Sequence, residues 1–340
     1  MKLEFIKKFS ESNRITSSKD YYISLSYIGN SLYSKKDFSY IGCTNDFSDC
    51  DTGDVTEDDK YFLGKNPHQG FYVYDVKTEK KVGFYDISPL CSLNVLGACF
   101  SLDSKFFYAL IAIPKDQTVP PMMMNEYITN CTVQLKVLEM PSLKEVKTIP
   151  ITKKFVNISP CKFLNGYVLV GFDNTLSFFD GKTFKDYPST KLQHYLLSVD
   201  EKRKRFYTLS DYGVRIYDQT FNEINRYDLI SDAEEVVNNS LYGYLAMDPI
   251  DPMMNNTEAT KKVPKETLVS FDLLKDDYLV SLSVESLQRF SRIAVFNLDD
   301  GKKVAETIIN GGINSIDVVD KDKIAFPMKG NMHLLEAKDD

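Results

Sequence analysis

A short apolar segment that ends in Asp, Glu or Asn recurs along this chain. Each copy is five or six residues long, rich in aromatic and β-branched side chains, and runs into a polar turn, a pattern typical of β-strands. The six copies are Phe71–Asp75, Gln134–Glu139, Leu176–Asp180, Val214–Asp218, Ile293–Asn297 and Met332–Glu336. A unit that returns roughly every 40 residues indicates a repeat architecture built from strands.

For an all-β repeat of this period we predict a β-propeller, with the acid-ended segment as the third of four strands in each blade. The sequence stops at the sixth copy of this third strand, and no fourth strand follows it. The N-terminal segment Leu3–Phe9 has the length and pattern of the missing strand. We therefore expect the N-terminal strand to pair in the last blade, which closes the ring and leaves no open sheet edge.

The spacing of the copies leaves two blade counts open. Asp218 and Asn297 are separated by almost two periods, and Leu268–Asp272 imitates a third strand within that interval. Only about 20 residues lie between Asp272 and Ile293, too few for three strands of ~5–6 residues with their turns. We therefore expect residues 1–340 to form a single propeller domain of six blades, with seven as the alternative.

The repeat resembles the YVTN-type and WD40-like propeller superfamily. Its best copy is Phe71–Asp75, followed by Thr78 and Lys80 in the turn toward the next strand. The chain departs from true WD40 repeats because it contains no Trp at all and lacks their Gly-His and Trp-Asp signatures. The resemblance implies a scaffold for protein contacts or, less often, a hydrolase or oxidoreductase. No catalytic motif of the superfamily carries over to this sequence.

Three stretches are longer than a plain propeller needs. Residues 46–70 and 112–130 are expected between the second and third strands of two blades, and residues 231–264 between two successive blades. Connections of these two kinds emerge on the same face of a propeller. The sequence therefore predicts inserted loops that all decorate one face, and long loops are frequently functional.

The inserted loops differ in chemistry. Asp46–Asp59 holds seven carboxylates in fourteen residues, which favours a solvated acidic loop over a Ca²⁺ site because the glycine and the bidentate Glu of an EF-hand are misplaced. The other two loops carry methionine tracts. These tracts either pack on each other and on the rim or form a partner-binding patch; the residues of that patch are Met122, Met123, Met124, Met253, Met254 and Tyr127.

Charge and composition limit the classes of partner that we expect the protein to bind. A net charge of −7 and a pI near 5.2 argue against a nucleic-acid or anionic-membrane surface, because both need clustered Lys and Arg. The basic run Lys202–Arg205 falls in an expected hairpin turn and is interpreted as a solvated loop. The N-terminus has no signal-peptide pattern and no stretch is apolar enough for a membrane helix, so we expect a cytoplasmic protein.

Two functions remain open from the sequence. The preferred one is a non-enzymatic scaffold, without a cofactor, that binds a protein partner through the loop-decorated face. The alternative is a lactonase-like, metal-dependent hydrolase in which polar residues at the starts of the innermost strands hold a divalent cation such as Ca²⁺ at the mouth of the central channel. Its candidate ligands are Asn94, Asn157, His194, Glu266 and Asn314.

Overall fold

The computed structural model describes strands, turns and bends, and contains no helix in the part of the chain that it describes. It describes residues 1–339 apart from 27–29, 45–51, 67–68, 79, 88–94, 116–130, 152–154, 165, 173–174, 188–196, 210–211, 231–233 and 239–259. No described helix is long and apolar enough to cross a bilayer.

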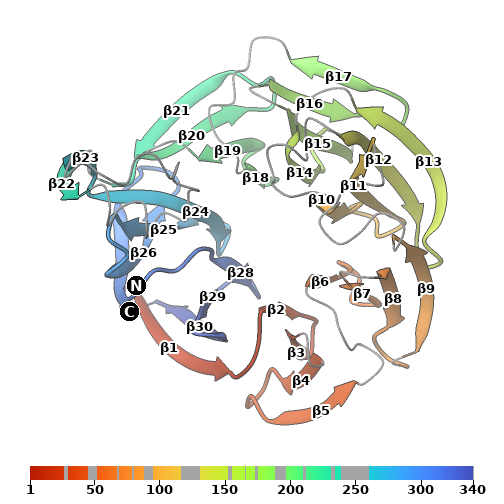
Figure 1. Cartoon of the computed structure of the whole chain (residues 1–340), viewed down its shortest axis with the longest axis horizontal. Coiled ribbons are helices and arrows are strands. Elements are labelled where there is room, and N and C mark those ends of the chain that lie inside the picture. Colours follow the sequence, from red (N-terminus) through yellow and green to blue (C-terminus); the bar gives the residue numbers. More distant parts are fainter. Residues whose placement is uncertain are drawn as a thin grey trace.

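The described strands form seven antiparallel sheets of four strands arranged around a common axis (Figure 1). We number these sheets as blades 1 to 7 and give their strands from the innermost to the outermost. Blade 1 is β2 (Arg14–Ser17), β3 (Tyr21–Leu25), β4 (Asn30–Ser34) and β5 (Tyr40–Thr44). Blade 2 is β6 (Thr52–Val55), β7 (Tyr61–Asn66), β8 (Gly70–Asp75) and β9 (Lys81–Asp86). Blade 3 is β10 (Val95–Phe100), β11 (Phe106–Pro114), β12 (Cys131–Glu139) and β13 (Lys144–Ile151).

The ring continues through four further blades. Blade 4 is β14 (Phe155–Cys161), β15 (Tyr167–Phe172), β16 (Thr175–Phe179) and β17 (Phe184–Tyr187). Blade 5 is β18 (Leu197–Asp200), β19 (Arg205–Leu209), β20 (Gly213–Asp218) and β21 (Glu223–Asp228). Blade 6 is β24 (Glu266–Leu274), β25 (Tyr278–Glu285), β26 (Phe290–Asn297) and β27 (Lys303–Asn310). Blade 7 is β28 (Asp317–Val319), β29 (Lys323–Met328), β30 (Asn331–Lys338) and β1 (Lys2–Phe9).

The predicted closure of the ring is confirmed. Strand β1 pairs antiparallel with β30, from Lys2 opposite Lys338 to Phe9 opposite Met332. The pairing places the N-terminal strand outermost in the last blade, beside the strand that ends the chain (Figure 1). All six acid-ended segments are the third strands of their blades, as expected.

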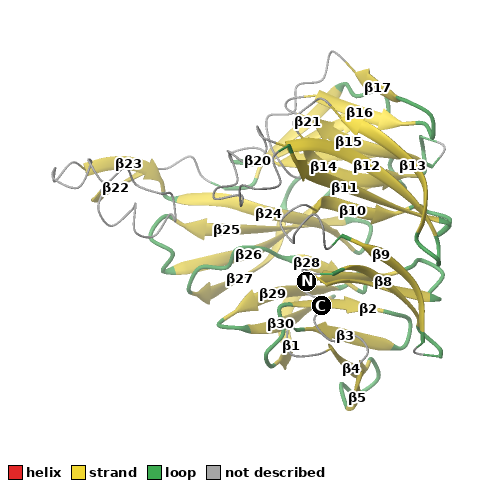
Figure 2. Ribbon diagram, turned by 45° about the vertical axis from the view of Figure 1, so that its right-hand side comes forward, coloured by secondary structure: helices red, strands yellow, loops and turns green. Residues whose placement is uncertain are grey.

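Of the two blade counts, the described sheets match the alternative of seven, and the preferred count of six is corrected accordingly. The additional sheet is blade 1, residues 14–44, rather than a blade between residues 231 and 292. Its third strand ends in Ser34 instead of an acid, so the recurring signature does not reveal it. Residues 231–264 instead contain a two-stranded sheet, β22 (Glu234–Asn238) paired with β23 (Thr260–Pro264), that stands outside the ring (Figures 1 and 2).

The expected insertion at residues 46–70 is also corrected. Strands β6 and β7 lie inside this stretch and form the first hairpin of blade 2, with Asp54 opposite Leu63. Carboxylates in and beside β6 made a short strand look like a polar loop. Of the seven carboxylates, Asp54 lies in β6, and Glu57, Asp58 and Asp59 lie in the turn between β6 and β7.

The core lies between neighbouring blades, where the faces of their sheets meet. Blades 6 and 7 share one apolar cluster that includes Leu282, Ile293, Ile316 and Ile324, all buried. Burial of such β-branched and aromatic side chains on both faces of each sheet stabilises the ring.

The connections on the two faces of the ring differ. First-to-second and third-to-fourth strands are joined on one face, here called the turn face, always by three to five residues. These turns need few glycines because other residues take positive φ: Lys275 and Asp276 (50° and 57°) and Asp320 and Lys321 (60° and 59°) lie in three-residue hairpin connections. We call the opposite side, where the remaining connections emerge, the loop face.

Ion pairs join the turns of neighbouring blades on the turn face. The Arg203 side chain is only 14% exposed and contacts Asp200 within its own blade and Asp277 and Asp299 of blade 6. The interpretation of Lys202–Arg205 as a solvated loop was therefore wrong for Arg203. Lys35 of blade 1 reaches Asp320 of blade 7 in the same way, with 2.7 Å between Nζ and Oδ1.

Candidate functional site at the inner strands

The seven inner strands carry a polar residue at one common level. In each blade, this residue pairs across the first hairpin with the third residue of the second strand. We call its place the polar position. Its occupants are Thr16, Asp54, Cys99, Ser159, Ser198, Asp272 and Asp317. Each of these residues has a hydroxyl, thiol or carboxyl group and lies on the innermost strand of its blade.

Two of these carboxylates tie neighbouring blades together. Asp54 Oδ1 accepts a hydrogen bond from the Thr16 hydroxyl of blade 1 at 3.1 Å and another from the Val55 amide at 2.8 Å. Asp272 Oδ2 accepts one from the Val318 amide of blade 7 at 3.0 Å. The polar position is therefore part of the joints between blades.

Both carboxyl groups are difficult to ionise. Loss of hydration is the largest cause in each case, and it raises the pKa of Asp54 and raises the pKa of Asp272 to about 6. The side chain of Asp54 is nevertheless open at the surface of the channel. A wall residue surrounded by protein on most sides can touch water and still lose much of its hydration, so the two observations agree.

Arg14 lies among these carboxylates. Its Nε is 3.8 Å from Asp317 Oδ2, and both side chains are 42% exposed. Asp54 and Asp272 also feel the Arg14 charge, which opposes the rise of their pKa values. Among the described residues, none accepts a hydrogen bond from the guanidinium, so its donors point to the channel and the adjacent cavity.

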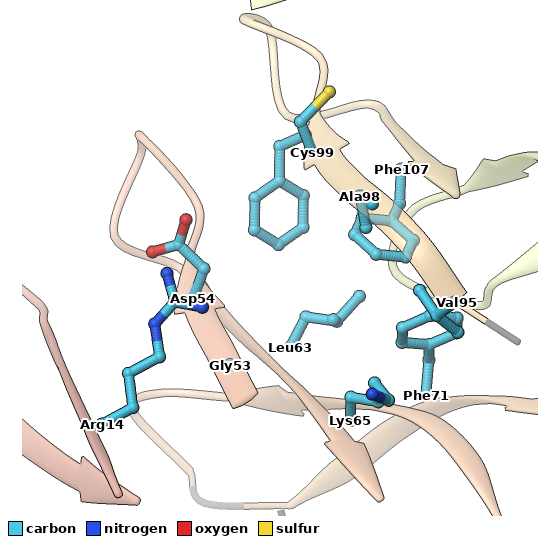
Figure 3. Close-up of a pocket in the computed structure, with 12 residues that line it drawn as sticks. Arg14, Gly53, Asp54, Leu63, Lys65, Phe71, Val95, Ala98, Cys99 and Phe107 are labelled. Atoms are coloured by element: carbon cyan, nitrogen blue, oxygen red, sulfur yellow. The ribbon is translucent and has the colours of Figure 1, made fainter. Parts of the chain in front are cut away.

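A cavity of about 250 Å³ lies between the inner strands of blades 2 and 3. Figure 3 shows the Arg14 guanidinium and the Asp54 carboxylate facing one another at one end. The remaining wall includes the apolar side chains of Leu63, Phe71, Val95, Ala98, Phe100 and Phe107, with Lys65 also in the lining. The cavity thus combines polar groups with aromatic and aliphatic side chains.

A second cavity, of about 410 Å³, lies under the hairpin turns of blades 5, 6 and 7. Its wall mixes three acids, Asp200, Glu201 and Asp276, with the lysines Lys202, Lys275 and Lys321, and Asp272 lies at its inner side. Lys202 and Lys275 are paired with Asp277 and Asp339. Because its charges are mixed and largely compensated, this cavity has no evident preference for one class of ligand.

Of the five candidate metal ligands of the hydrolase hypothesis, the structure describes the side chains of Glu266 and Asn314. The Glu266 carboxylate accepts a hydrogen bond from the Ser283 hydroxyl at 2.7 Å and pairs with Arg292 at 3.2 Å, which lowers its pKa. Asn314 is exposed, and Asn157 lies in β14, of which only the backbone is described there. Asn94 and His194 lie outside the described residues. Within the described part of the chain, no three His, Cys, Asp or Glu side chains are grouped as metal ligands.

The predicted partner-binding residues all lie outside the described part of the chain. Met122, Met123, Met124 and Tyr127 fall between β11 and β12, and Met253 and Met254 fall between β22 and β23. Both connections leave the ring on the loop face, so the methionine patch stays a prediction.

Sequence reasoning missed Arg14, Asp54, Asp272 and Asp317. The search for polar residues stopped at the starts of the inner strands, whereas these four lie within or at the boundary of the strands themselves. A usable signal was present for Asp272 and Asp317, which stand beside hairpins that the sequence does reveal, whereas the hairpins beside Arg14 and Asp54 were not recognised. Without the register of that hairpin, a single Asp within an apolar run cannot be distinguished from a turn residue.

Comparison with known proteins identifies the fold. No protein-family model matches the chain, and no curated protein matches it. Among solved structures it is similar to the β-propeller domain of Cps50 (Swd1) from Myceliophteria thermophila, with a TM-score of 0.61 and 11% sequence identity over 99% of this chain and 100% of that domain. The protein is therefore a β-propeller, and the resemblance to WD40-like propellers holds at the level of fold. At this identity the likeness shows the fold alone.

Proposed function

We propose that this protein is a non-enzymatic propeller scaffold that binds a protein partner through its loop face. The observation that carries the proposal is the difference between the two faces. Every connection on the turn face has three to five residues, whereas the loop face carries the connection from β11 to β12 and the one from β21 to β24, residues 229–265. Long connections confined to one face of a rigid scaffold are where propellers and similar folds place binding residues.

The hairpin β22–β23 supports this assignment. It belongs to the longest connection, and it projects from the ring next to blade 6 (Figure 2). A two-stranded sheet has two unpaired edges and is marginally stable on its own, so a partner that covers it would stabilise it. The methionine tracts Met122–Met124 and Met253–Met254, which lie in these same two connections, supply adaptable apolar anchors.

The hydrolase alternative receives no comparable support. Glu266 was its one charged ligand, and this carboxylate is already held by Arg292 and Ser283. Releasing it would leave the Arg292 guanidinium with Glu306 alone. The proposed function therefore rests on binding, and we expect the partner to be a protein rather than a nucleic acid because the net charge is −7.

The proposal is tested by capture of bound proteins from a lysate of the source cells with three forms of the chain. Met123→Asp with Met253→Asp changes the loop face, Lys144→Asp with Lys182→Asp is the matched control on the turn face, and the unchanged chain is the reference. We expect the methionine double variant to lose a partner that the other two retain, with all three unfolding at similar temperatures. Equal capture by the two double variants, or a large loss of stability in the methionine variant, would contradict the proposal.

A further inference from the structure

The cavity between blades 2 and 3 originates at one register position. The residue that precedes the polar position on each inner strand, here called the apolar position, is large in five blades. These five residues are Ile15, Ile158, Leu197, Phe271 and Ile316. In blades 2 and 3 it is Gly53 and Ala98, and both line the cavity. At Gly53 the Phe62 ring takes the place of a side chain. The small side chain of Ala98 is therefore the residue type that leaves this space open.

The exposed fractions of the residues at this position show how a large and a small side chain differ in filling the joint. Ile15, Leu197, Phe271 and Ile316 are between 2% and 8% exposed, so they fill the space beside the inner strands. Ala98 is exposed, although it lies on an inner strand. Strands β6 and β10 also approach one another less closely than the other neighbouring inner strands do.

The polar end of the cavity offers one donor and one acceptor. The Arg14 guanidinium donates to none of the described residues, while both hydrogen bonds to Asp54 end on Oδ1 and leave Oδ2 to accept. Charges of both signs meet here, because Arg14 lies beside Asp54 and Asp317 and Lys65 also lines the cavity. An anion would meet two carboxylates and a cation would meet two basic groups, so a neutral group with both a donor and an acceptor fits best.

The apolar wall suits one side chain of moderate size. Leu63, Phe71 and Phe107 are buried and form a fixed surface, to which Val95 and Phe100 add. A cavity of about 250 Å³ is smaller than most sites for cofactors and drug-sized molecules, which occupy ~300–1,000 Å³. It has the size and lining of a pocket that receives one anchor residue of a protein partner.

We propose that this cavity binds an apolar anchor residue of a partner protein together with the backbone amide beside it. The side chain packs on Val95, Ala98 and Phe100, the backbone carbonyl accepts from Arg14, and the backbone N–H donates to Asp54 Oδ2. Lys65, Phe71 and Val95 lie at the loop-face ends of their strands, so this pocket continues the proposed binding face. The inference rests on the proposed function and adds the chemistry of the segment that is recognised.

The test uses capped tripeptides and saturation-transfer NMR, which detects weak binding on the peptide signals. The probe is acetyl-Gly-Leu-Gly-amide, compared with the same peptide carrying Lys or Asp in place of Leu. We expect the leucine peptide to bind the unchanged chain at least about tenfold more tightly than either charged peptide. Ala98→Leu should abolish this binding, whereas the control Ile316→Leu, at the equivalent position of blade 7, should keep it.

Two results would overturn the inference: equal binding of the three peptides, or binding by Ala98→Leu as tight as that of the unchanged chain. Because large residues occupy the same position in five blades, Ala98→Leu should fold, and Ala98→Val provides a smaller second variant. If the leucine peptide fails to bind while the loop face still captures a partner, the inference is wrong and the proposed function stands. If the peptide binds but capture is insensitive to the loop face, the proposed function is wrong and the pocket stands.

Discussion

The joint between blades 6 and 7 and the joint between blades 2 and 3 use the same register of the same fold in opposite ways. At the first, Ile316 occupies the apolar position and packs in the core of the two blades, and Asp272 accepts a hydrogen bond from Val318 across the joint. At the second, Ala98 occupies that position and lines a cavity, while Leu63, Phe71 and Phe107 pack the rest of the joint. The comparison teaches that the side chain at the apolar position decides whether the inner end of a joint is filled or holds a cavity.

The largest expected effect comes from opening the filled joint. Ile316→Ala removes a side chain that is 4% exposed and packs in the core between blades 6 and 7. Truncation of a buried Ile costs about 2–5 kcal/mol, because the lost transfer free energy is joined by the cost of the cavity. Urea unfolding should show this loss, whereas Ala98→Gly should cost no more than about 1 kcal/mol. Equal losses at the two sites would show that the joints do not differ.

A smaller effect is expected from the pH dependence of the filled joint. Burial raises the pKa of Asp272 to about 6, above its ordinary value near 4, so the folded chain binds a proton more tightly than the unfolded chain. Protonation of this group therefore stabilises the fold below about pH 4, and the contribution is lost as the pH rises through 6. Asp272→Asn should remove this part of the pH dependence.

The measurement is the free energy of unfolding of the unchanged chain and of Asp272→Asn at several pH values from 4 to 7. From pH 4 to pH 7, the free energy of unfolding of Asp272→Asn should rise by about 1–3 kcal/mol relative to that of the unchanged chain. A pKa raised by about two units corresponds to at most about that amount. Other carboxylates, such as Asp103 with its lowered pKa, act in the opposite direction in both proteins and cancel in the difference. A difference that does not vary with pH would contradict the assignment.

The sequence predicted the class of fold and the way the ring closes because these depend on local signals. Strand alternation, polar turns and the acid at the end of each third strand are repeated often enough to be read without a structure. Blade 1 escaped because Asn30–Ser34 lacks that acid, and β6 escaped because Gly53 and Asp54 are poor strand formers. In both strands, pairing with neighbours overrides the local preference.

The candidate site was less accessible from the sequence because it depends on long-range register. Arg14 and Asp317 are about 300 positions apart, yet their side chains pair because the ring closes between blades 7 and 1. The meaning of Ala98 emerges only when seven inner strands are aligned on their hairpins. Arg203 shows the same limit, since a basic run in a turn gives no sign that one of its members is held by acids of two blades.

The most direct test of the comparison is the free energy of unfolding of Ala98→Leu, measured by urea titration beside the unchanged chain. If the joint between blades 2 and 3 is open, the added side chain fills empty space as Leu197 does in blade 5, and stability should rise by about 0.5–2 kcal/mol. If the space is already filled, overpacking should lower stability by about 1–3 kcal/mol. An increase agrees with open space beside Ala98, and a decrease would contradict it.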